Sequence, residues 1–125
     1  MPRAARTPKP IAAAINAGLR DFGENRLEEA VHKMPQVAAL SDVPIRWHMI
    51  GHLQSRKIRY LAGFSLLHSL DSLKLAQRLE RFCAQAGRIL PALVEFNLGG
   101  EASKSGYAAW DETRWEIILP ELEQI

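Results

Sequence analysis

Polar side chains that could do chemistry recur along the chain, each time directly after a short apolar run. They are Glu24 and Asn25, the stretch 51–54, Ser69 and Asp71, and the stretch 97–105. Amide, carboxylate, hydroxyl and imidazole groups of this kind suit a polar or anionic ligand, and backbone N–H groups at helix starts can join them. The sequence therefore predicts one shared ligand site built from four separate segments.

The histidines do not predict a metal site. His48 and His52 are four residues apart, a spacing that can chelate a metal when both lie on one helix. Here His48 falls in an expected strand and His52 in the loop after it. A hydrogen-bonded histidine near a strand end is an equally good interpretation of His48 and His68. Cys83 is the only cysteine, so no internal disulfide can form, and its apolar helical setting indicates a packing thiol.

The elements expected to position these residues alternate between helix and strand. Apolar spacing and stop signals predict helices at 11–17, 26–34, 54–62, 72–86 and 110–125, and strands at 22–25, 45–50, 64–68 and 90–98. Pro35 is expected to end the second helix, and Pro120 to break or kink the last one. Alternating strands and helices predict an α/β fold with a parallel sheet, whose carboxyl edge would gather the polar segments.

Composition limits the architecture and the partners. The 125 residues, 47% hydrophobic and 24% charged, suit a single globular domain over 1–125. A complete (β/α)8 barrel takes about 250 residues, so about half of one is expected. Without an apolar run of about 18 residues or a secretory signal, we expect a cytoplasmic protein with no membrane partner. A net charge of +2 does not argue for nucleic acid, and the cluster Arg56, Lys57 and Arg59 is interpreted as a solvated helix face.

Four segments resemble a known family in order and spacing. They are AGLRDFGENR at 17–26, WHMIGHLQSRK at 47–57, HSLDS at 68–72 and NLGGEASKSGY at 97–107. Together they resemble the signature blocks of the pyridoxal-phosphate homeostasis family. The resemblance implies a partial (β/α)8 TIM-type barrel like the N-terminal barrel of alanine racemase. It also implies pyridoxal 5′-phosphate bound through a lysine imine, and a role in vitamin B6 cofactor homeostasis without catalysis.

The same resemblance implies the site residues. Asn25 is expected beside the cofactor, with His48, Ser69 and Asn97 in the same crevice. Three alignments of the family lysine remain open: counting back from residue 17 gives Ala4, aligning on threonine gives Arg6, and a shifted alignment gives Lys9. Arginine stays protonated and cannot form an imine, so Lys9 is the candidate amine. The family's phosphate-binding groups correspond to positions after Ile125, and Glu95 replaces an uncharged polar residue.

Two other functions remain open at this stage. A pyridoxal-phosphate-dependent racemase sharing the fold would need a second proton-transfer residue, and the sequence nominates no catalytic residue. A truncated barrel that binds no cofactor would expose two sheet edges and an apolar face. Such a chain is expected to self-associate.

Overall fold

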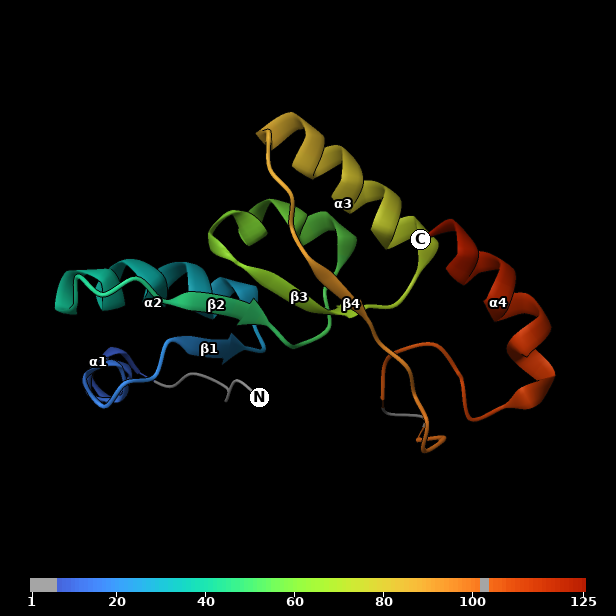
Figure 1. Cartoon of the computed structure of the whole chain (residues 1–125), viewed down its shortest axis with the longest axis horizontal. Coiled ribbons are helices and arrows are strands. Elements are labelled where there is room, and N and C mark those ends of the chain that lie inside the picture. The colour runs from blue at the N-terminus through green and yellow to red at the C-terminus, as the bar shows by residue number, and fades with distance from the viewer. Residues whose placement is uncertain (1–6, 102–103) are drawn as a thin grey trace.

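The computed structural model describes residues 7–101 and 104–125. Its sheet holds four parallel strands in the order β1-β2-β3-β4. The strands are β1 (Asp21–Glu24), β2 (Arg46–Met49), β3 (Leu66–Leu70) and β4 (Ala92–Val94). The helices are α1 (Pro8–Asn16), α2 (Leu27–Leu40), α3 (Leu73–Ala86) and α4 (Trp115–Gln124), with 3-10 helices η1 (Ser55–Gly63) and η2 (Glu112–Arg114). Helices and strands alternate as predicted (Figure 1).

One face of the sheet is covered by helices. Along β2 and β3 the buried side chains Trp47, Met49 and Leu67 alternate with less buried neighbours, as expected when one face packs more closely than the other. Phe22 of β1 is buried as well. These side chains meet apolar residues of the helices in one core: Ile11 and Ile15 of α1, Leu27, Ala30 and Val37 of α2, Ile58 and Leu61 of η1, and Leu75 and Leu79 of α3. The opposite face carries Asp21, His48 and His68, and we call it the inner face.

Local chemistry explains where α3 begins and ends. The hydroxyl of Ser72 accepts a hydrogen bond from Leu75 N at 3.1 Å, which caps the first turn. Gly87 ends the helix in the left-handed conformation, with φ of 66°. Next to it, the Arg88 guanidinium donates to the carbonyl oxygens of Ala62 and Phe64, both at 2.6 Å. Arg88 thereby ties the end of α3 to the end of η1.

Several predicted boundaries were wrong. The first helix starts at Pro8 rather than at residue 11, and the third strand covers Leu66–Leu70 rather than 64–68. Pro35 does not end α2, which continues to Leu40 because Val37 is 2% exposed and holds the last turns against the core. The strand expected at 90–98 is regular only over β4, with one backbone hydrogen bond to β3 on either side of it, and Phe96 instead bridges Tyr107. The last helix starts at Trp115 rather than at residue 110, after the short η2, and Pro120 lies inside it.

Within the part of the chain that the structure describes, no helix is both long enough and apolar enough to cross a membrane.

Candidate functional site

The carboxyl ends of the strands meet at one edge of the sheet, as predicted. Ile50 N donates to Glu24 O at 2.9 Å, and Glu95 N donates to Leu70 O at 2.8 Å. These bonds continue the β1–β2 and β3–β4 ladders just past the ends of β2 and of β4. The four polar segments nominated from the sequence therefore leave the sheet on the same side.

Gly51 joins two of the predicted site residues. A Cβ atom on Gly51 would lie 2.2 Å from Asn25 O, so only glycine lets the loop after β2 approach the end of β1. On its other side, the Ser69 hydroxyl donates to Gly51 O at 2.7 Å. Gly51 thus contacts both Asn25 and Ser69, and the three residues link the ends of β1, β2 and β3. The sequence placed Gly51 in a polar stretch but did not reveal this packing role.

The two outer members of this group differ in accessibility. The Asn25 side chain is exposed and makes no hydrogen bond to the described residues. Ser69 is fully buried, and its hydroxyl holds the Gly51 loop. Contact of either side chain with a cofactor stays a prediction.

His48 belongs to a different group, on the inner face. Its Nε2 lies 2.9 Å from Asp21 Oδ1, at the start of β1, and its Nδ1 lies 2.9 Å from His68 Nε2. Arg46 donates to both carboxylate oxygens of Asp21, at 2.6 and 2.7 Å. Hydrogen bonds from Arg46 and then from His48 hold the pKa of Asp21 well below its usual range.

These contacts restrict the protonation of the two histidines. A carboxylate only accepts, so His48 Nε2 donates to Asp21, and a neutral His48 must then accept at Nδ1 from His68. Burial, followed by the neighbouring His48, lowers the pKa of His68. The inner face thus carries a hydrogen-bonded row of four polar side chains. One signal of this row was present in the sequence: Arg46 and His48 are two residues apart in a strand and therefore share a face.

Asn97 organises the loop after β4 rather than extending that row. Its Nδ2 donates to Glu101 O at 2.9 Å, and its Oδ1 accepts from Gly100 N at 3.1 Å. Its backbone N–H donates to Tyr107 O at 2.7 Å. The Tyr107 hydroxyl is buried and has no hydrogen bond of standard geometry among the described residues, although burial and the nearby Glu121 carboxylate raise its pKa to about 12.

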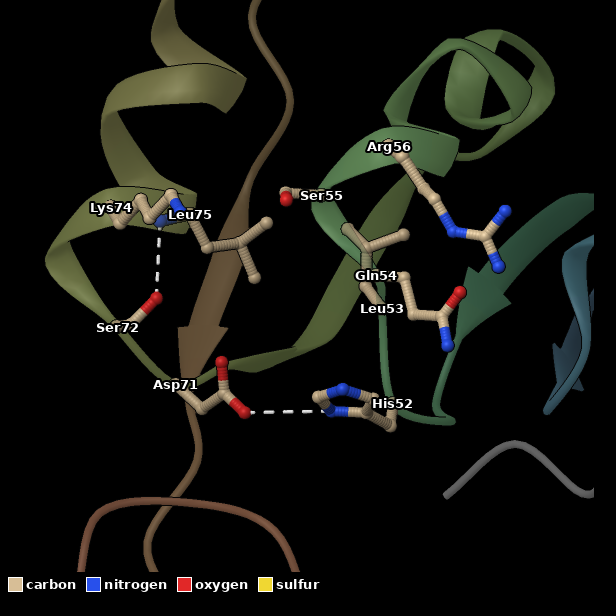
Figure 2. Close-up of a pocket in the computed structure, with 9 residues that line it drawn as sticks. All are labelled: His52, Leu53, Gln54, Ser55, Arg56, Asp71, Ser72, Lys74 and Leu75. Atoms are coloured by element: carbon tan, nitrogen blue, oxygen red, sulfur yellow. Dashed lines mark hydrogen bonds and ion pairs between the residues drawn. The ribbon is translucent and has the colours of Figure 1, made fainter.

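A cavity of about 380 Å³ opens between the loops after β2 and β3 (Figure 2). Its lining includes His52 and Asp71, whose Nδ1 and Oδ2 atoms are 3.5 Å apart. Burial and then the Asp71 carboxylate raise the pKa of Glu95, which lies close by, and His52 opposes that rise. Among the residues that the structure describes, no three His, Cys, Asp or Glu side chains form a group that could hold a metal.

The lysines that could provide an amine differ in how exposed they are. Lys9 is exposed in the first turn of α1. Ala4 and Arg6, the other two alignments of the family lysine, lie outside the described residues. Lys33 is nearly buried, on the helix-covered side of the sheet, where its Nζ lies 2.7 Å from Glu24 Oε1. Burial outweighs this ion pair and raises the pKa of Glu24.

Comparisons with known proteins agree with this architecture. The alanine racemase N-terminal domain family matches residues 9–123. A pyridoxal phosphate homeostasis protein of Pseudomonas aeruginosa is 49% identical over 107 residues, which are 82% of this chain and 45% of that protein. One from Synechocystis is 38% identical over 114 residues, which are 90% of this chain and 50% of that protein. The chain spans about half the length of these curated relatives.

Solved structures give the same result. PipY of Synechococcus elongatus, without pyridoxal phosphate, superposes with a TM-score of 0.78 at 35% identity, over 99% of this chain and 57% of that one. The form of PipY with pyridoxal phosphate bound superposes with a TM-score of 0.76 at 34% identity, over 99% of this chain and 56% of that one. The predicted fold class, parallel strands alternating with helices in a partial barrel, is confirmed. The chain belongs to the alanine racemase N-terminal domain family.

Proposed function

We propose that this chain binds pyridoxal 5′-phosphate and serves the intracellular homeostasis of this vitamin B6 cofactor without catalytic turnover. The observation that carries the proposal is the meeting of Asn25, Gly51 and Ser69 at the carboxyl edge of the sheet, where parallel α/β folds bind ligands. The named relatives and the ligand-bound PipY structure support it. The composition and the single cysteine favour the cytoplasm as its compartment.

The described residues fit the cofactor in their chemistry. When bound, pyridoxal phosphate supplies an aldehyde that condenses with an amine and a phosphate that needs hydrogen-bond donors. Lys9 offers an exposed amine, and Asn25 offers an amide that no described residue uses. We assign Lys9 as the attachment point and Asn25 as the ring contact. His48, Ser69 and Asn97 would support the site through the contacts described above.

The test is covalent trapping. The purified chain is mixed with pyridoxal phosphate, reduced with borohydride and mapped by peptide mass spectrometry. We expect one stoichiometric adduct at Lys9 that Lys9→Arg abolishes, because arginine keeps its proton and cannot condense. The matched control Lys104→Arg, at another exposed lysine, should leave the adduct unchanged. No adduct, or adducts scattered over Lys57, Lys74 and Lys104, would show that the signature persists without cofactor binding.

A second proposal is that the chain self-associates. β1 and β4 are the edges of the four-stranded sheet, so each presents backbone groups that no other strand among the described residues pairs. Nine of the thirteen exposed large apolar side chains among the described residues come after residue 88, on β4, its loop and α4. We infer that β4 and α4 bury this apolar surface against a second copy of the chain.

Light scattering tests the self-association. We expect an oligomer whose mass falls toward that of a monomer when Ile117 and Leu119, which are 69% and 55% exposed, are both replaced by lysine. The control pair Leu19→Lys and Leu40→Lys adds the same charge at exposed sites elsewhere and should keep the oligomer. A monomeric unmodified chain at dilute concentration would rule the proposal out.

A further inference from the structure

A row of positive side chains crosses the helix-covered side of the molecule, away from the inner face. η1 and α3 pack side by side there (Figure 1), and Arg78 of α3 donates to the Ser55 hydroxyl of η1 at 3.1 Å. The exposed cations on these two helices are Arg56, Arg59, Lys74, Arg78 and Arg81. We call these five residues the basic face.

The charge of the basic face is not compensated. η1 and α3 together hold six basic residues and one acidic residue, Glu80. The whole chain has a net charge of only +2, so the remainder of the molecule is acidic. Lys57, the sixth cation, is paired with Glu28. None of the five cations of the basic face has an ion-pair partner among the described residues.

Spacing places these charges in a line. Lys74, Arg78 and Arg81 are separated by four and three residues, so they lie on one side of α3. Like charges at this spacing repel one another and weaken the helix. A partner with repeating negative charges would remove that repulsion.

Two hollows lie along the row. The cavity in Figure 2 has Arg56 of η1 on one side and Lys74 of α3 on the other, and its one carboxylate, Asp71, faces His52. A second hollow, of about 370 Å³, is lined by Arg78, Arg81, Phe82 and Gln85. Phe82 is partly buried against the core, and the part of its ring that lines the hollow lies beside guanidinium groups, a surface on which nucleobases stack.

We propose that the basic face binds single-stranded nucleic acid, with phosphates on the row of cations and a base in the hollow at Phe82. A membrane surface fits less well, because interfacial helices expose large apolar side chains, and no described residue of η1 or α3 is an exposed large apolar one. The sequence alone led us to expect a solvated helix face. The packing of α3 against η1 supplies the reason for the new assignment. The five cations lie on η1 and α3, and the cavity of Figure 2 opens beside them at the carboxyl edge of the sheet. Nucleic-acid binding would use these cations and does not rest on the proposed function.

The test measures fluorescence anisotropy of a labelled, mixed-sequence 20-nucleotide single strand with the full chain. We expect a Kd of about 10⁻⁶ to 10⁻⁴ M at physiological salt. Five neutralised phosphates give a salt slope of about −3.5, so affinity should fall about a hundredfold between 50 and 200 mM. The triple variant Lys74→Gln, Arg78→Gln, Arg81→Gln should bind at least about tenfold more weakly, with a slope of about −1.4.

The control variant changes the same charge away from the basic face. It combines Arg26→Gln, Lys104→Gln and Arg114→Gln, three exposed residues on other segments, and should retain the salt slope. Equal losses of affinity in the two triple variants would show that the strand is attracted by the net charge of the protein rather than by the basic face, and would overturn the proposal. The absence of binding, tighter binding to duplex than to the single strand, or binding only to vesicles with 30% phosphatidylserine would each overturn it as well.

Discussion

Gly51→Ala is expected to destabilise the protein by at least about 3 kcal/mol. The new methyl carbon would lie 2.2 Å from Asn25 O and 2.8 Å from Asn25 C. Both are backbone atoms, so no side-chain rotation can relieve the overlap, and the loop after β2 must move away from β1. That movement also strains the Ser69 hydrogen bond to Gly51 O. Urea denaturation followed by circular dichroism measures the loss.

Gly63→Ala is the matched control for this overlap. A methyl group there would approach only the flexible end of the Met34 side chain, at 3.2 Å. We expect a change within about 1 kcal/mol. Similar losses of stability in Gly51→Ala and Gly63→Ala would show that the close approach of Gly51 to Asn25 does not limit which residue can stand at position 51. Because Gly51 also joins Asn25 to Ser69, Gly51→Ala should lose covalent trapping of pyridoxal phosphate even at temperatures where the variant stays folded.

Lys33→Met should remove about 3 to 5 kcal/mol of stability at neutral pH. The side chains of Lys33 and Glu24 are 12% and 4% exposed, so removing the ammonium leaves a carboxylate buried without that partner. The double variant Glu24→Leu, Lys33→Met should recover much of the loss, because a buried ion pair and an apolar pair of similar size differ little in stability. Lys57→Met is the surface comparison: Glu28 is half exposed, and a much smaller change is expected.

The pH dependence distinguishes this account from a simple packing defect. The pKa of Glu24 is already raised above 4.5 in the folded protein, and loss of Lys33 raises it further. A carboxyl whose pKa is higher folded than unfolded makes the folded state bind more protons, so its contribution to stability falls as pH rises. The deficit of Lys33→Met should therefore shrink as pH is lowered toward 4.5 in thermal denaturation. A deficit that is independent of pH would contradict the assignment.

The sequence by itself determined the alternation of helices and strands and most of their positions. Its signals are local: Ser72 caps α3 with its own hydroxyl, Gly87 ends that helix with a positive φ, and apolar residues repeat at the spacing of each element. The polar strand-end segments were also predictable, because carboxyl ends of parallel strands share an edge. Pro35 shows where such reasoning fails, since burial of Val37 outweighs the cost of a proline inside α2.

Only the tertiary structure decided which of these residues touch. Asp21, His48 and His68 come from three strands, and their row of hydrogen bonds depends on the register of β1, β2 and β3. The close approach of Gly51 to the backbone of Asn25 likewise depends on how two loops cross. The basic face exists because α3 packs beside η1, which adds the charges of two segments that are separate in the sequence. Side-chain contacts and summed charge depend on distances between elements, and a linear pattern specifies only the elements themselves.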